Sequence, residues 1–465
     1  MIHGGRALAI LLGAAIGAAS ASRPAGDPDV YWHLATAREA LAHGIVRGDL
    51  FSWTIRGAPV STDQWMGQLL LYGAYLIDGW AGLVLLRAVA VATLMALVFA
   101  NAAIVGRGAR LLVPLVASVP AILVSQYVWS ERPELFGFVC FAALLLLLRL
   151  ARAGSDRALA LVVPLVLIWS NLHGSFALGV ALVAVVSLEG AWREPARRRA
   201  YAIVTLASVA VTLLTPAGLG AWTAPGFHFL TPPREIQEWA VPDIHTAIGA
   251  LFVLTVGLVA AVALITRCMP AREAAILLPI VLLAATAVRH TPLFAIAAAP
   301  YLALYGPPAL GVLRLRLPAR PFNPSEPNTR VMSRVSVAAA LILGILATGI
   351  APTAPDESRF PVAALSVIPA GPGLFNHYDW GGWLIWHAPA TPVFIDGRYT
   401  PYRCCGVLDD YQTVIAAEPG WPEVVARRGI RSILVRPSDP IAIRGIESGW
   451  TVLGRAPGFV LLRIP

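Results

Sequence analysis

The sequence is poor in charged residues. Of its 465 residues only 13% are Asp, Glu, Lys or Arg, about half the share found in soluble globular proteins. That is too few to cover a water-facing surface, so a soluble enzyme is excluded. The hydrophobic share of 57% and the mean hydropathy of +0.70 also exclude a disordered chain. Most of the surface must therefore face lipid.

Lysine is absent and cysteine is scarce. All 35 basic residues are arginine, and there are four cysteines. The arginines lie mainly in short connections between apolar runs and not on one amphipathic face, which indicates membrane topology and argues against nucleic acid as a partner. Cys404 and Cys405 are adjacent, a poor geometry for bridging each other. The cysteines show neither a disulfide framework nor a zinc-binding spacing.

Eleven apolar runs are long enough to span, or nearly span, a bilayer core of about 30 Å. They cover residues 7–22, 81–105, 111–128, 135–148, 158–170, 176–190, 200–214, 247–265, 274–288, 291–306 and 335–350. If the N-terminus is cytoplasmic, alternate connections are arginine-rich, as the positive-inside rule requires. We therefore predict a polytopic α-helical membrane protein of about 11 transmembrane helices. The Ala- and Arg-rich, Lys-free composition favours the cytoplasmic (inner) membrane of a bacterium.

The pattern predicts two domains. Residues 1–351 form the transmembrane domain, with a long first outer loop at 23–80. In residues 352–465, short apolar runs alternate with Gly, Pro and Asp turns, which indicates a small α/β domain. An odd number of spans places that domain outside the cytoplasm. The ending Ala19-Ser20-Ala21 of the first run also fits a cleavable signal peptide, and cleavage there leaves every later segment on the same side.

The first outer loop opens with two acids one residue apart. Asp27-Pro28-Asp29 is followed by Tyr31 and His33. Two such carboxylates can hold a divalent cation such as Mg²⁺ or Mn²⁺, or provide a general base. The same pattern also fits a turn in which Asp29 caps a helix that starts near Tyr31. The spacing alone does not choose between these alternatives.

Other polar residues gather at the remaining outer loops. They are Glu131 and Arg132 in the second loop, His173 in the third, Glu238 in the fourth, and Arg289 with His290 at the end of a span. Arg289 has no acid beside it in the sequence, as a binding site for a lipid phosphate requires. For Arg132 and His173 the alternative is an ordinary polar group wetted at the bilayer surface.

Two polar-aromatic segments stand out in the C-terminal domain. Tyr378, Asp379 and Trp380 precede a pair of glycines, and further along Asp396 and Arg398 flank a third glycine. Clustered aromatic rings can stack on the apolar face of a sugar, and glycine allows close backbone approach. The alternative is that these residues only pack the domain and form its turns.

Taken in this order, the segments resemble those of polytopic glycosyltransferases of the GT-C fold class, which use lipid-phosphate-linked sugars. The segments that carry the resemblance are Asp27-Pro28-Asp29 with Tyr31-Trp32-His33, Arg132-Pro133, Asn171-Leu172-His173-Gly174, Arg289-His290, Tyr378–Trp383 and Asp396-Gly397-Arg398. A looser likeness is to the oligosaccharyltransferase catalytic subunit. Its Trp-Trp-Asp-Tyr-Gly motif is only partly matched around Asp379, because the tandem Trp is missing.

The resemblance implies an enzyme that transfers a sugar from a polyprenyl-phosphate-linked donor to a glycan, lipid or protein acceptor outside the cytoplasm. Asp27 or Asp29 would act as the base in a single inverting displacement, and a divalent cation at these acids occurs in some members of the class. Arg289 and His290 would stabilise the departing phosphate. Glu131, Arg132, His173 and Glu238 would shape the site, and the segment containing Tyr378, Asp379 and Trp380 would form part of an acceptor wall.

Two other function classes fit a polytopic chain. A lipid or glycan transporter places ionisable groups near the bilayer midplane, where this sequence offers mainly Arg87 and Glu189. A sensor or assembly scaffold would use residues 352–465 but would leave the loop acids without a role.

Overall fold

The computed structural model describes residues 4–105, 112–231, 236–313 and 353–465. The chain divides into two compact units. The helical unit contains Met1–Arg23 and Ala81–Thr353, and the sheet unit contains Pro24–Trp80 and Ala354–Pro465. The first outer loop predicted from the sequence thus folds as part of the same unit as the C-terminal segment.

The helical unit is built from long apolar helices. They are α1 (Gly4–Ala21), the second part of α3 (Trp65–Val105), α4 (Leu112–Ser125), α5 (Glu134–Arg152), α6 (Asp156–Leu172), α7 (Phe176–Arg193), α8 (Arg198–Val211), α9 (Thr223–Leu230), α10 (Ala247–Thr266), α11 (Ala271–Ala284) and α12 (Thr291–Val312). Every predicted apolar run lies on one of these helices except 335–350, which falls outside the described residues.

Five helices in the described ranges are long and apolar enough to cross a membrane: Trp65–Val105, Glu134–Arg152, Phe176–Arg193, Ala247–Thr266 and Val288–Val312. Two shorter apolar helices cover Ala7–Ala21 and Leu112–Val128. The predicted polytopic helical architecture is therefore confirmed in outline. The number of spans and their orientation stay predictions.

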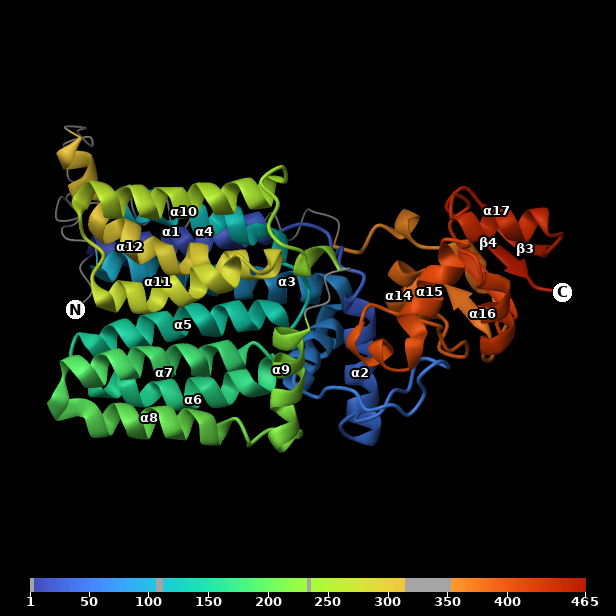
Figure 1. The fold of residues 1–465 in the computed structure, drawn as a ribbon, viewed down its shortest axis with the longest axis horizontal. Coiled ribbons are helices and arrows are strands. Elements are labelled where there is room, and N and C mark those ends of the chain that lie inside the picture. Colours follow the sequence, from blue (N-terminus) through green and yellow to red (C-terminus); the bar gives the residue numbers. More distant parts are fainter. Residues whose placement is uncertain (1–3, 106–111, 232–235, 314–352) are drawn as a thin grey trace. The chain divides into compact units, whose positions relative to one another are not determined.

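Helices α5 to α8 lie side by side in the helical unit (Figure 1). Small residues let them approach closely, since a methyl group added at Gly190 of α7 would lie 2.6 Å from the ring of Tyr201 in α8. Arg149 and Arg152, in the last turn of α5, pair with Glu273 at 3.0 Å and Glu189 at 2.9 Å. Arg149 and Arg152 are thus neutralised by carboxylates on other helices of the unit.

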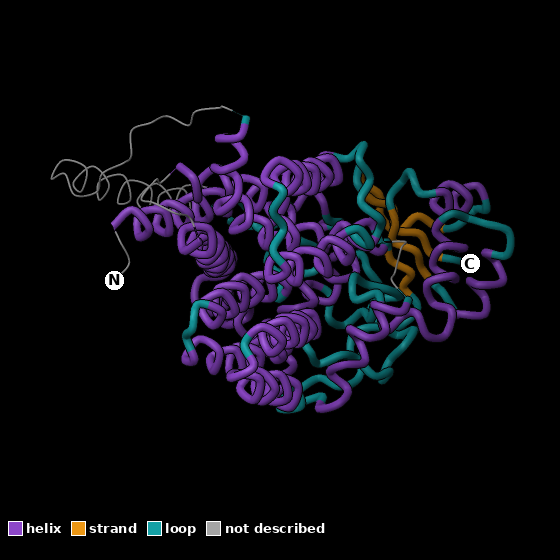
Figure 2. The backbone as a smooth tube through the Cα atoms, turned by 60° about the vertical axis from the view of Figure 1, so that its left-hand side comes forward, coloured by secondary structure: helices purple, strands orange, loops and turns teal. Residues whose placement is uncertain are grey.

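The sheet unit contains a four-stranded sheet flanked by helices (Figure 2). Its elements are α2 (Val30–His43), the first part of α3, β1 (Leu374–Asn376), α14 (Gly381–His387), α15 (Val407–Ile415), α16 (Trp421–Arg428), β2 (Ser432–Val435), α17 (Pro440–Glu447), β3 (Thr451–Ala456) and β4 (Phe459–Arg463). The strand order is β1-β2-β4-β3, with β1 parallel to β2 and the other neighbours antiparallel. All four strands lie in the C-terminal segment, which agrees with the α/β character predicted there. The predicted domain boundary and the place of the domain outside the cytoplasm stay predictions.

Backbone hydrogen bonds attach the first outer loop to this sheet unit. The Trp53 N–H donates to the Val393 carbonyl at 3.1 Å, and the Val393 N–H donates to the Phe51 carbonyl at 3.0 Å. The Trp53 indole donates to the Leu374 carbonyl at 3.0 Å. These bonds satisfy backbone groups that neither segment pairs by itself, which explains why the two stretches fold together despite their separation in the sequence.

Candidate active site

The two acids of the first outer loop lie at the start of α2. Asp29 occupies the N-cap position, but its side chain makes no capping hydrogen bond. The Asp27 carboxylate instead accepts the backbone N–H of Asp29 at 3.0 Å. The capping alternative is therefore right about position and wrong about the role of the Asp29 side chain, whose carboxylate is not used to satisfy the helix end.

The Asp29 carboxylate is packed against Gly397. A methyl group at position 397 would lie 2.9 Å from Cγ of Asp29 and would overlap its Oδ1. A methyl group at Gly382 would lie 2.8 Å from the Pro28 carbonyl oxygen. Two of the motifs singled out in the C-terminal segment therefore form a glycine-lined notch around Asp27-Pro28-Asp29, which no larger residue would allow.

The two residues that flank Gly397 in the sequence, Asp396 and Arg398, belong to a buried charge network. The Arg398 guanidinium binds Asp396 through two nitrogens, at 2.8 and 2.5 Å, and Asp49 at 2.6 Å. The Tyr402 hydroxyl donates to Asp396 at 2.5 Å. The side chains of Asp49 and Asp396 are 0% exposed, and Asp49 also accepts two hydrogen bonds from Ser52.

The electrostatics of this network fix its protonation. Burial opposes the charge of Arg398, yet the neighbouring Asp396 and Asp49 carboxylates raise its pKa well above the usual value. Burial, with Asp396, likewise raises the pKa of Tyr402. Arg398 is thus a cation and Tyr402 a hydrogen-bond donor at any physiological pH. Because Arg398 and Asp396 bind each other below the surface, the structure favours a positioning role for them over direct substrate contact.

The aromatic residues of the segment Tyr378–Trp383 are mostly core residues. Trp380 is 3% exposed, and its indole donates to the Arg359 carbonyl at 3.1 Å. Trp383 is also buried and stacks on Phe360. A surface platform of indole rings for a sugar is therefore not what the motif builds. The exposed member is Asp379, which pairs with Arg436 at 2.7 Å in the short turn that also holds Tyr378.

His33 is buried inside the sheet unit. Its Nδ1 lies 3.2 Å from the side-chain nitrogen of Gln68, and its ring lies against that of Trp32. Gln68 is a polar partner that the sequence reasoning missed, because it lies inside an apolar run of α3.

In the helical unit, charged residues from three loops come together around Arg289. It pairs with Glu134 at 2.6 Å and Glu238 at 3.3 Å, and its guanidinium lies 4.5 Å from the ring centre of Trp239. Arg132 reaches the other oxygen of Glu238 at 3.4 Å. Arg289 has no acid beside it in the sequence, but the fold brings two carboxylates to it, because sequence neighbours do not show which loops fold together.

The Arg289 cluster contains further residues that the sequence analysis did not select. Glu134 lies in the same predicted outer loop as Arg132, but the sequence does not show that it pairs with Arg289. Tyr127 donates its hydroxyl to the Val288 carbonyl at 2.5 Å, which holds the turn of Arg289. His290 lies edge-on to Trp239, with ring centres 5.7 Å apart.

Glu131 and His173 belong to separate structural networks. Glu131 is 1% exposed and pairs with Arg87, whose Nε donates to the Ala21 carbonyl at 3.0 Å. His173 Nδ1 lies 2.9 Å from the Ser175 hydroxyl, which also accepts from the Trp169 indole. Arg87, one of the charges that a transporter would use, is thus neutralised by a carboxylate.

Among the described residues, Asp27 and Asp29 have few further metal ligands around them. Within residues 4–105, 112–231, 236–313 and 353–465, no group of three or more His, Cys, Asp or Glu side chains is placed to hold a metal ion. Asp27 and Asp29 alone supply a small part of the six or more oxygen ligands that Ca²⁺ or Mg²⁺ takes. The residues described do not fit a protein-held Mg²⁺ or Mn²⁺, and the mechanism below uses none.

Comparisons with known proteins place the fold. No protein-family model and no curated protein matches this sequence. Among solved structures, the archaeal oligosaccharyltransferase AglB from Archaeoglobus fulgidus, in complex with an inhibitory peptide and a dolichol-phosphate, is similar over 92% of this chain and 69% of its own, with a TM-score of 0.58 and 13% identity.

Two further structures agree. ArnT from Cupriavidus metallidurans, bound to undecaprenyl phosphate, matches over 97% of both chains with a TM-score of 0.52 and 13% identity. The arabinofuranosyltransferase AftD from Mycobacteria matches over 97% of this chain and 41% of its own, with a TM-score of 0.51 and 18% identity. This chain has the GT-C fold. The fold expected from the sequence resemblance is thereby confirmed.

Proposed function

We propose that the protein is a membrane glycosyltransferase that transfers a sugar from a polyprenyl-phosphate-linked donor to an acceptor outside the cytoplasm. Two of the similar structures contain a polyprenyl-type phosphate, which supports this donor class. The observation that carries the proposal is the environment of Asp29. Its carboxylate lies against Gly397 in the glycine-lined notch, which fixes its position as a general base requires.

In the proposed reaction, Asp29 takes the proton of an acceptor hydroxyl while that oxygen attacks the anomeric carbon. The bond from this carbon to the phosphate oxygen breaks, and the electron pair leaves with the polyprenyl phosphate. A single displacement of this kind inverts the anomeric configuration. Asp27 is the second candidate for the base, although its carboxylate already accepts the Asp29 N–H and so also holds the turn.

Arg289 and Arg132 are the proposed binding groups for the donor phosphate. Negative charge grows on the phosphate as the sugar–oxygen bond breaks, and guanidinium groups stabilise such charge. In this proposal both guanidinium groups donate hydrogen bonds to the phosphate oxygens. Glu134 and Glu238 already neutralise the two arginines, so the phosphate must compete with a carboxylate for them. We expect it to displace Glu238 first, because Glu238 lies at the longer distances from both guanidinium groups.

A transfer assay with mutants tests the base. Purified protein in nanodiscs, given radiolabelled polyprenyl-phosphate sugar and candidate acceptors, should form a labelled product. Asp29→Asn should lower the rate by about 10²- to 10⁴-fold, the usual contribution of a general base, with an unchanged unfolding temperature. Asp409→Asn, at an exposed acid of α15, is the matched control. Full activity of Asp29→Asn would remove the proposed base.

The membrane orientation is part of the proposal. The sheet unit would lie outside the cytoplasmic membrane of a bacterium, where an acceptor glycan, lipid or protein is available. Alkaline phosphatase fused after residue 465 should then be active in intact cells, and an inactive but stable fusion would contradict this orientation.

The transporter alternative predicts movement of a labelled lipid across the bilayer without release of its sugar. The two charges it would use are paired here, Arg87 with Glu131 and Glu189 with Arg152. The same nanodisc preparation, compared with liposomes containing the protein, distinguishes the two functions.

A further inference from the structure

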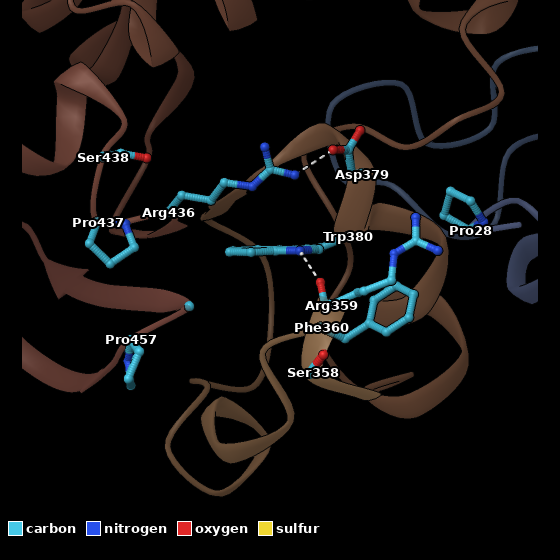
Figure 3. Close-up of a pocket in the computed structure, with 11 residues that line it drawn as sticks. Pro28, Ser358, Arg359, Phe360, Asp379, Trp380, Arg436, Pro437, Ser438 and Pro457 are labelled. Atoms are coloured by element: carbon cyan, nitrogen blue, oxygen red, sulfur yellow. Dashed lines mark hydrogen bonds and ion pairs between the residues drawn. The ribbon is translucent and has the colours of Figure 1, made fainter. Parts of the chain in front are cut away.

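The sheet unit contains an open pocket of about 600 Å³, and Asp379 and Trp380 of the predicted acceptor wall are among the residues that line it (Figure 3). Pro28, between the two candidate acids, forms part of its wall. Arg359 lines it as well and donates a hydrogen bond to the Gly26 carbonyl at 2.9 Å. The pocket therefore opens directly beside the turn that holds the proposed base.

The polar lining of the pocket is mainly cationic. Arg359 and Arg436 line it against one carboxylate, that of Asp379, and Ser358 and Ser438 add hydroxyl groups. Figure 3 shows the Arg436 guanidinium turned toward Asp379, at 2.7 Å. Both partners of that pair are about half exposed, at 46% and 51%. Such an exposed ion pair is weak, so an incoming anion can share Arg436 at little cost.

Arg359 is similarly able to bind an anion. Its bond to Gly26 occupies one of the five N–H donors of a guanidinium, and the residue is exposed. A planar guanidinium on a pocket wall binds carboxylate or phosphate groups in a bidentate way. The Ser358 hydroxyl already donates to the Asp356 carboxylate at 2.6 Å and can accept a hydrogen bond from a sugar, while the Ser438 hydroxyl has the capacity of any serine both to donate and to accept. Trp380 also lines the pocket, but at 3% exposed it offers apolar surface and little area for stacking.

We propose that this pocket binds the acceptor and selects a saccharide that carries an anionic group, a carboxylate or a phosphate. Arg436 and Arg359 would bind the anion, the serines would contact ring hydroxyls, and one hydroxyl would reach the acid turn. The inference rests on the proposed function, since it names the acceptor class of the same reaction.

Binding can be measured apart from transfer. Full-length Asp29→Asn protein in nanodiscs is titrated with three probes: methyl glucuronide, methyl glucoside 6-phosphate and the neutral methyl glucoside. We expect the two anionic probes to bind at least about tenfold more tightly at low salt, with the preference shrinking at high ionic strength. The double variant Arg359→Gln, Arg436→Gln in the same background should lose the preference.

The control is Arg444→Gln, which removes an exposed arginine of α17 that pairs with Glu447 and does not line the pocket; it should keep the preference. Equal affinity for charged and neutral probes, no binding of any probe, or a preference that survives the double variant would each overturn the acceptor class. Displacement of the glucuronide by polyprenyl phosphate would assign the pocket to the donor and overturn it as well. The titration measures binding to a variant that lacks the proposed base. Its result can therefore be interpreted even if the wild-type protein transfers no sugar.

Discussion

Replacing Gly397 with alanine should displace the proposed catalytic carboxylate and leave the fold intact. The new methyl group would lie 2.9 Å from Cγ of Asp29 and overlap Oδ1. The obstructing atoms are the end of a side chain, which can rotate away by about 1 Å. A misplacement of about 1 Å at a reacting group can cost about 10²-fold in rate, so kcat should fall by that factor while the KM for the donor stays near the wild-type value.

Backbone strain should not add to the loss of activity in Gly397→Ala. Gly397 is not among the glycines with positive φ, so alanine fits its conformation. Gly73→Ala is the neutral control, since a methyl group there meets nothing within 4 Å. Gly381→Ala is the contrasting control. Its methyl group would overlap the main-chain oxygen of Ile395, which cannot rotate away, so stability should fall by about 1–3 kcal/mol.

The assay follows initial rates of sugar transfer at several donor concentrations, together with the unfolding temperature of each variant. A Gly397→Ala protein with wild-type kcat would refute the assignment of Asp29 as the base held by this notch. A variant that loses activity and stability together would instead show that the glycine only supports the fold.

Three further expectations concern the remaining polar groups. Asp49→Asn removes one of two carboxylates around buried Arg398 and should lower the unfolding free energy by about 1.5–3 kcal/mol, measured by urea denaturation. Arg289→Ala should lower kcat/KM for the donor about tenfold or more, because the guanidinium both binds the phosphate and stabilises its growing charge; equal activity at limiting donor would contradict its role. Burial and the nearby Arg436 hold the pKa of His377 below its usual value of 6.5. The unfolded chain therefore binds more protons below that pH, and stability should be full above about pH 6.5 and fall as pH drops toward the lowered pKa; His377→Asn should flatten the profile.

The sequence predicts the fold well because apolar periodicity and length act locally. Each described apolar run forms a helix, and turn residues mark the C-terminal α/β segment. The association of residues 24–80 with residues 354–465 was not predicted. It depends on hydrogen bonds such as that between Trp53 and Val393, between positions that nothing in a single sequence relates.

The candidate site shows the same division. Motif order selects Asp29, Gly397 and Arg289 but not their neighbours in space. The carboxylates that neutralise Arg289 come from other loops, and they turn an expected free cation into a balanced cluster. The burial of Trp380 likewise depends on tertiary packing, because an indole that stacks on a sugar and one that fills a core have the same composition.

The anomeric configuration of the product tests the central claim most directly. If Asp29 deprotonates the acceptor in one displacement, NMR of the product should show the configuration opposite to that of the polyprenyl-phosphate donor, and Asp29→Asn should yield no product. A product that keeps the donor configuration would contradict the account, since retention requires two displacements and a nucleophile in place of a base.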